Sequence, residues 1–201
     1  MADDDVDWDY VHRSNFEQAA FWDVNWIRKA KDLFESAKKL EPELIRVWES
    51  YRARAKDFKT PLAPDYYQGT YFMLLAFAVE NLLKATAVAR NSIKYREEFR
   101  KTLRFPEELK SHDLLKLSEL AQLSFNTKEE ELLRRLTRSA VWFGRYPAPL
   151  HYTKMSGSEQ FHDGNEYSLS WFGETDVSRL RAFISSLPSR LNIPEKYWDS
   201  A

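Results

Sequence analysis

Arg145 and His151 are the two residues whose types and spacing are best suited to chemistry on a phosphate. They lie in the segment GRYPAPLH, residues 144–151, together with the phenol of Tyr146. A guanidinium binds a phosphate through paired hydrogen bonds, and an imidazole takes up and releases protons near neutral pH. We therefore name Arg145 and His151 as candidate catalytic residues and Tyr146 as a candidate binding residue.

Four further polar residues stand where they can bind a ligand. Glu80 and Lys84 are the only charged residues of the segment 71–89, and they are four positions apart, on one face of a helix. His112 and Asp113 fall in the segment SHDLLKL, at the start of another predicted helix, where negative charge is favoured. We name all four as candidate binding residues. The structural alternatives are a local salt bridge between Glu80 and Lys84 and capping of the helix by Asp113.

The sequence also excludes several kinds of chemistry. The chain has no Cys, and therefore no disulfide, no thiolate metal site and no cysteine nucleophile. It lacks the HExxH, G-x-S-x-G and GxGxxG patterns of metalloproteases, serine hydrolases and dinucleotide-binding proteins. No two of its four His are spaced to share a metal ion on one helix. We accordingly predict neither a metal site nor a cofactor.

The segment 71–89 predicts the central element of the fold. It contains no Gly or Pro and is apolar on most sides, which is typical of a helix that is buried on most sides. Its apolar runs are too short, and its charged pair too central, for a membrane span. We predict a core helix with Phe72, Leu75 and Leu82 almost fully buried, and no association with a membrane.

The N-terminal quarter predicts a long helix after a flexible acidic lead, residues 1–13. Ser14 or Asn15 can cap a helix that keeps the helical period to residue 55. Pro42 removes a backbone donor and clashes with the preceding turn. We therefore expect the helix to break within a turn of Pro42.

Two shorter helices are predicted beyond the core helix. The segment 91–108 is charged and irregular, and we expect no regular element in it. Ser111 or Asp113 then caps a helix with an inward stripe of leucines. Thr127 opens a capping box for the next helix, which ends at Gly144.

Residues 145–174 are the least regular part of the chain. Two prolines exclude a helix at its start, and the rest is rich in turn residues. Tyr152–Lys154 and Tyr167–Trp171 can pair as a short hairpin. Because a loop this long without structure is unusual, we treat it as a candidate functional surface. A last helix is expected to open at Glu174 and to be stopped by Pro188.

Together these elements predict an all-α protein. We expect an up-down bundle of four or five helices in one domain, residues 14–201, with a long irregular loop before the C-terminal helix. Lys and Arg number 30 against 31 Asp and Glu, so any nucleic-acid contact must come from a local patch. The N-terminus is acidic where a signal peptide is basic and then apolar, which predicts a cytoplasmic protein. The seven Trp exceed what a four-helix core needs and favour an oligomer interface.

Three segments, in this order, resemble motifs of the HEPN superfamily of all-α domains. They are AFAVENLLKA at 76–85, SHDLLKLSEL at 111–120 and GRYP at 144–147. The resemblance implies an up-down bundle of four or five helices that dimerises. It also implies, for many members, a metal-independent ribonuclease with an Arg-x(4–6)-His motif. Arg145 and His151 are the positions of this chain that match that spacing.

The chain departs from this motif in two ways. Tyr146 follows the Arg where a small polar residue is common, and two prolines between the pair make a helical presentation impossible. The RYP form resembles the branch that accompanies small nucleotidyltransferases. We therefore expect a HEPN-like homodimer with little or no catalysis, which binds nucleotide, RNA or a partner protein such as a nucleotidyltransferase or an antitoxin.

Two other interpretations stay open. The first is a metal-independent endoribonuclease of a toxin–antitoxin or phage-defence type, in which Arg145 holds the scissile phosphate and His151 moves protons at the ribose 2′-hydroxyl. The second is a helical adaptor whose Trp-rich first helix contacts another protein. Convergence of Arg145 and His151 with the same residues of a second protomer in one cleft would favour the ribonuclease. Without it, we expect Arg145 to pair with an acidic neighbour such as Glu80.

Overall fold

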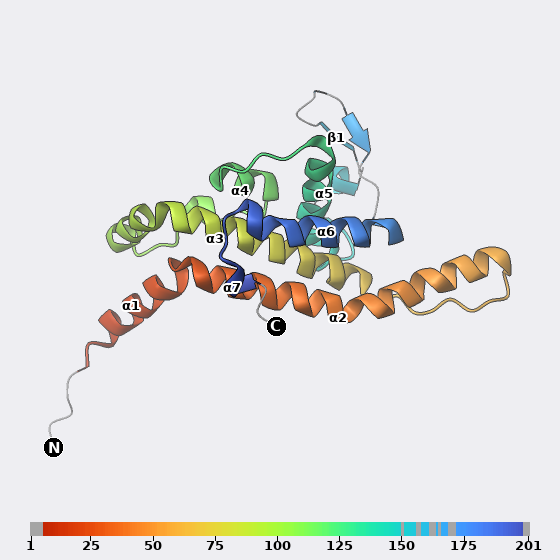
Figure 1. The fold of residues 1–201 in the computed structure, drawn as a ribbon, viewed down its shortest axis with the longest axis horizontal. Helices are drawn as coiled ribbons and strands as arrows, with labels where there is room; N and C mark the ends of the chain where they lie inside the picture. Colours follow the sequence, from red (N-terminus) through yellow and green to blue (C-terminus); the bar gives the residue numbers. More distant parts are fainter. Residues whose placement is uncertain are drawn as a thin grey trace, which may run out of the picture.

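The computed structural model describes residues 6–149, 151–155, 158–160, 164, 166–168 and 172–198. Its α-helices are α1 (Trp8–Ala20), α2 (Asp23–Lys56), α3 (Gln68–Thr102), α4 (Leu114–Leu120), α5 (Thr127–Arg138), α6 (Glu174–Arg190) and α7 (Glu195–Trp198). Three shorter helical elements are η1 (Glu107–Lys110), the π-helical η2 (Ser139–Phe143) and η3 (Tyr152–Met155). The predicted all-α bundle is confirmed (Figure 1).

The two longest helices, α2 and α3, form the spine of the molecule. They run side by side along its long axis (Figure 1) and share the most extensive contact between any two elements described. α3 is buried on most sides because α4, α5, η2 and α6 also pack on it. Phe72, Leu75 and Leu82 are at most 1% exposed, which confirms the predicted core helix.

α6 closes the core as predicted, with its apolar stripe turned inward. Val177, Leu180, Ile184 and Leu187 are all buried. Pro188 does not stop this helix, which continues to Arg190. A proline in the last turn removes one backbone bond only, and the Pro188 carbonyl still accepts from the Ile193 amide at 2.8 Å.

The predicted break at Pro42 is wrong. α2 continues from Asp23 to Lys56 and changes direction in Figure 1 without ending. Pro42 is exposed, so water can satisfy the carbonyl that its ring leaves without a donor. Ala37 and Leu44 meanwhile stay fully buried against the core. The chain breaks instead at Phe21–Trp22, between α1 and α2.

The predicted lead, residues 1–13, is helical from Trp8 onward. α1 begins at Trp8, and the Asp7 carboxylate caps it by accepting from the Tyr10 amide at 3.0 Å. Residues 8–13 are therefore helical, because an acidic side chain at this end satisfies an otherwise unpaired amide. α1 projects from the body of the molecule in Figure 1.

α3 also extends further than predicted, through the segment 91–102. Asn91 alone departs from helical geometry, with φ −127° and ψ 21°, and kinks the helix. Beyond the kink, Tyr95 and Phe99 are buried in a second small core with Phe21. Tertiary packing of aromatic rings therefore outweighs the charged, irregular local sequence.

The caps of α4 and α5 agree with the sequence to within one residue, whereas Ser14 and Asn15, which were predicted to cap the first helix, lie inside α1. The Asp113 side chain caps α4 as predicted and accepts from the next amides of the helix. The capping box of α5 is formed by Asn126 and Glu129, one residue earlier than the predicted Thr127.

A short hairpin does occur in the loop before α6, but its strands differ from the predicted ones. β1 (Ser158–Gln160) pairs antiparallel with β2 (Glu166–Ser168). Residues 152–155 form the turn η3, and residues 169–171 lie outside the described part of the chain.

Candidate functional site

The structure brings His112, from the turn before α4, against the Glu80–Lys84 pair of α3. The Glu80 carboxylate places Oε1 2.7 Å from Lys84 Nζ and Oε2 2.8 Å from His112 Nδ1. The side chains of Glu80 and Lys84 are 7% and 6% exposed, whereas that of His112 is 44% exposed. The expected salt bridge is therefore present, and its carboxylate also holds an imidazole that reaches the surface.

Arg145 reaches the same place through the ring of Phe77. The guanidinium carbon of Arg145 lies 4.8 Å from the Phe77 ring centroid, and the His112 ring lies 6.3 Å from it. His112 and Arg145 therefore both lie against the Phe77 ring, and His112 also contacts Glu80. Sequence reasoning missed Phe77, although its position one turn before Glu80 on an otherwise buried helix is a usable signal.

The turn before α4 fixes the position of His112. The Asp113 amide donates to the Ser111 hydroxyl at 3.0 Å, and the Leu114 amide donates to the Thr137 hydroxyl of α5 at 3.1 Å. Because its neighbours are held on both sides, His112 stays against Glu80. Asp113 has the capping role that we gave as its structural alternative.

A close crossing of η2 and α3 fixes the position of Arg145. Gly144 follows η2 and packs against the first turns of α3. A Cβ added to Gly144 would collide with the Met73 side chain and lie 2.8 Å from the carbonyl oxygen of Gly69. Only a glycine permits this approach, which brings the next residue, Arg145, over Phe77.

The charges of the site are set by the buried pair. The Lys84 ammonium lies 5.8 Å from the Trp26 ring, and the Trp26 indole in turn donates to the Ala20 carbonyl at 2.8 Å. Each desolvated charge needs its partner, because removing one leaves the other uncompensated. Against an ionised carboxylate, a neutral His112 carries its proton on Nδ1, which leaves Nε2 as a proton acceptor.

The arrangement is suited to binding an anion beside a basic nitrogen. Arg145 is exposed, and among the described side chains it forms no ion pair with a carboxylate. Its expected pairing with Glu80 is absent from this part of the chain, since both Glu80 oxygens have other partners. Arg145 therefore keeps its hydrogen-bond donors for a ligand.

The structure does not join Arg145 to His151. Both are exposed, and no hydrogen bond or ion pair links them in the segments that are described. Tyr146 is 55% exposed beside Arg145, and its amide donates to the Trp142 carbonyl at 2.7 Å. Of these two histidines, His112 and not His151 is thus the one whose ring lies against Phe77, the ring that Arg145 also contacts.

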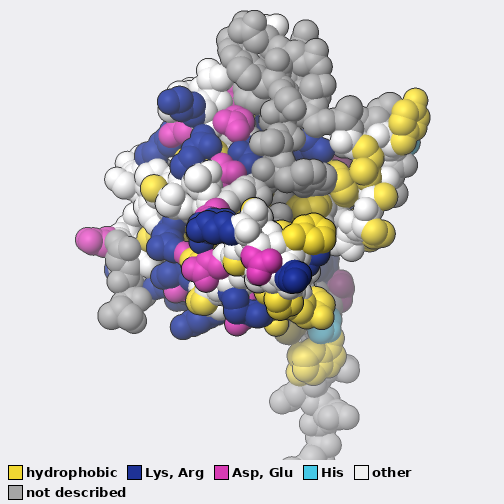
Figure 2. All heavy atoms as spheres, turned by 90° about the vertical axis from the view of Figure 1, so that its right-hand side faces the viewer, with side chains coloured by type: hydrophobic (Ala, Val, Ile, Leu, Met, Phe, Trp, Pro, Cys, Tyr) yellow, Lys and Arg dark blue, Asp and Glu magenta, His cyan; other side chains and the backbone are white. Residues whose placement is uncertain are grey.

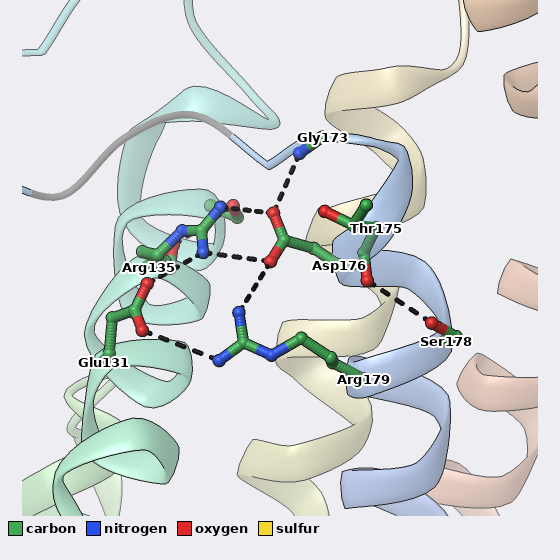
Figure 3. A network of polar contacts seen from close by, with 8 residues as sticks. Glu131, Arg135, Gly173, Thr175, Asp176, Ser178 and Arg179 are labelled. Atoms are coloured by element: carbon green, nitrogen blue, oxygen red, sulfur yellow. Dashed lines mark hydrogen bonds and ion pairs between the residues drawn. The ribbon is translucent and has the colours of Figure 1, made fainter.

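Arg135 forms a second buried network that the sequence analysis did not identify (Figure 3). Its guanidinium binds both oxygens of Asp176, at 3.2 and 2.6 Å, and lies 4.1 Å from the Phe172 ring. The Gly173 amide donates to Asp176 at 2.9 Å, and Arg179 completes the set. This network ties α5 to the start of α6.

The ionisation of Asp176 follows from these contacts. Burial by itself raises the pKa of Asp176, but the hydrogen bonds from Arg135 and the Gly173 amide outweigh it and hold the pKa below its ordinary value. The signal in the sequence was an Asp in the first turn of a predicted helix, which does not indicate the distant Arg.

Comparison with known proteins gives no relative: no family model, no curated protein and no solved structure matches the chain.

Among the described residues no three His, Cys, Asp or Glu side chains cluster as metal ligands. α3 is the one helix of the described part that is long and apolar enough to cross a membrane. Its most apolar window is 72% buried, as in the core helix of a soluble protein.

Proposed function

We propose that the chain is a HEPN-like helical module, a homodimer that binds nucleotide, RNA or a partner protein such as a nucleotidyltransferase or an antitoxin, with little or no catalysis. The observation that carries the proposal is the meeting of Glu80, His112 and Arg145 around Phe77. These residues come from or adjoin the three segments on which the HEPN resemblance rests.

The chemistry of the site favours a phosphate-bearing ligand. Arg145 offers a planar fork of donors that matches two phosphate oxygens. Tyr146 is exposed next to it, and exposed aromatic rings stack on unpaired bases in single-stranded RNA. With a net charge of −1 for the whole chain, such a local patch is where binding must occur.

The experiment is a fluorescence-anisotropy titration of a labelled single-stranded RNA pool with the wild-type protein, Arg145→Ala and Arg46→Ala. Arg46 is a matched control, because it is 54% exposed on α2 and pairs only with its neighbour Glu43. We expect Arg145→Ala to weaken binding about tenfold, as loss of a phosphate contact to a charged donor does. Equal affinities for both variants would contradict the proposal.

A second candidate function is a metal-independent endoribonuclease. The observation that favours it is an imidazole, His112, that the Glu80 carboxylate holds against Phe77, the ring that Arg145 also contacts; a carboxylate-bound imidazole is suited to general acid–base catalysis. In the ribonuclease predicted from the sequence, His151 was the imidazole that moves protons. Incubation of RNA with the protein in EDTA tests both: we expect feeble cleavage or none. Robust cleavage that is lost in Arg145→Ala would establish the nuclease, and His112→Ala against His151→Ala would identify the imidazole.

A further inference from the structure

A second polar pocket lies away from this site, between α1 and the last turns of α3. It has a volume of about 400 Å³ and is lined by Ser14, Glu17, Gln18, Trp22, Arg96 and Arg100. Trp22 stands at the break between α1 and α2, and both arginines lie beyond the kink of α3. The pocket therefore depends on two features of the fold that the sequence did not predict, the break at Phe21–Trp22 and the helix beyond Asn91.

Glu17 holds the two guanidiniums in place. Arg100 contacts both Glu17 oxygens, at 3.0, 3.1 and 2.8 Å, and Arg96 lies 3.9 Å from the same carboxylate. The hydrogen bond from Arg100 lowers the pKa of Glu17, so the carboxylate stays ionised at neutral pH. Arg96 is fixed further by donating to the Phe21 carbonyl at 3.1 Å.

The guanidiniums still have donors for a ligand. Arg100 uses Nε and one terminal nitrogen on Glu17, and its side chain is 62% exposed, so its other terminal nitrogen is available. Arg96 is 35% exposed. The pocket is lined by two guanidiniums and one carboxylate, and Glu97 lies close enough to Arg100 to influence it.

Trp22 supplies a flat apolar surface at the same place. Trp22 is 42% exposed, so part of its indole is open to a ligand in the pocket. The Arg28 guanidinium lies 5.8 Å from its ring and adds positive charge nearby. An exposed indole beside paired guanidiniums is how proteins hold a base and its phosphate together.

We infer that this pocket is a second ligand site, which takes a nucleoside phosphate with an aromatic base. The base stacks on Trp22, the phosphate binds Arg96 and Arg100, and the Glu17 carboxylate accepts from a ribose hydroxyl. This site is separate from the one around Phe77, and it does not depend on the function proposed for that site.

The test is isothermal titration with AMP of the Arg145→Ala protein, in which the site around Phe77 is impaired. We expect AMP still to bind to this protein. The further change Trp22→Ala should weaken the affinity for AMP about tenfold, because one base-stacking contact is lost. Phe58→Ala is the matched control, because Phe58 is 81% exposed and also lies under a guanidinium, that of Arg54, but outside the pocket. Arg100→Ala should also weaken binding.

Three outcomes would overturn the inference: no AMP binding to Arg145→Ala, equal binding with and without Trp22, or equal loss in Phe58→Ala. Inorganic phosphate and adenosine, titrated separately, should each bind more weakly than AMP. Phosphate binding as tight as AMP would show that no base is recognised and would also sink the inference. If Arg145→Ala lost its affinity for RNA but still bound AMP, the result would support both the site around Phe77 and the pocket at Trp22.

Discussion

At the scale of single residues, the candidate site depends on the Glu80 carboxylate. One oxygen faces a buried ammonium and the other faces an imidazole at the surface. In a desolvated environment such contacts are strong, and leaving either partner alone is costly. The carboxylate therefore fixes Lys84 behind it and His112 in front of it.

Glu80→Gln keeps the shape of the side chain and removes its charge. Lys84 then remains buried without a counter-charge, and we expect the free energy of unfolding to fall by about 3–5 kcal/mol, measured by urea denaturation. The double variant Glu80→Gln/Lys84→Met removes both charges and should recover most of that loss. Equal stability losses in the single and double variants would show that the pair is not coupled.

Asp176 should make the protein sensitive to acid. Its pKa is lowered in the folded state, so it stabilises the fold above its unfolded pKa, and this stabilisation is lost as the pH falls through the folded value. When the pH is lowered below about 4, we expect the urea concentration at the unfolding midpoint to fall. This fall should be smaller in Asp176→Asn than in the wild type. The fall is reduced and not abolished, since the pKa values of Glu17 and Glu108 are also lowered. Identical pH profiles for the two proteins would contradict this account.

At the scale of elements, the crossing of η2 over α3 decides where Arg145 lies. Gly144→Ala forces a Cβ into the Met73 side chain and the Gly69 carbonyl. We expect a loss of about 1–3 kcal/mol in thermal or urea denaturation, because this contact has no room to relax. Gly173→Ala is the control: nothing lies within 4 Å of its added Cβ, and it should cost less than about 1 kcal/mol. Similar losses for both glycines would mean that the crossing is not close.

The periodicity of the chain was enough to find the core helix, the inward stripe of α6 and the cap at Asp113. These features are local, since burial of a helix repeats with its own turns. Periodicity did not predict that α2 continues through Pro42. A proline on an exposed helix face need not end a helix whose other face is held by the core. Nor did periodicity predict helix at 91–102, which is held by packing against Phe21 from a remote part of the chain.

Glu80, Lys84, His112 and Arg145 were named from their sequence context as candidates, but their arrangement was not predicted. The contact of Arg145 with Phe77 depends on how η2 crosses α3, which no local pattern encodes. Arg145 was paired with His151 because of their spacing in the chain. That spacing does not show whether the two side chains lie close together in space.

At the scale of the whole molecule, basic and acidic residues are nearly equal in number, 30 against 31. On the face in Figure 2, basic and acidic side chains are interspersed, and hydrophobic side chains gather toward the right-hand edge. Exposed aromatic residues of the described chain include Tyr66, Tyr146 and Tyr152, at 75%, 55% and 87% exposure. Aromatic residues exposed to this degree are typical of a surface that meets another protein.

We accordingly predict a homodimer. Sedimentation at tens of micromolar protein should give twice the chain mass of 23.8 kDa. Tyr66→Ser should shift the equilibrium toward monomer, whereas Tyr51→Ser, a change at a 47% exposed position on α2, should not. A single species of 23.8 kDa at every concentration would exclude the dimer.

The most direct test of the central claim is an NMR titration of the histidine ring signals with AMP. Assignment by His112→Gln separates His112 from the three other histidines of the chain. If the site around Phe77 binds a phosphate-bearing ligand, the His112 signals should shift on addition of AMP, and the shift should disappear in Arg145→Ala. His112 signals that stay in place while AMP saturates the wild-type protein would contradict the account.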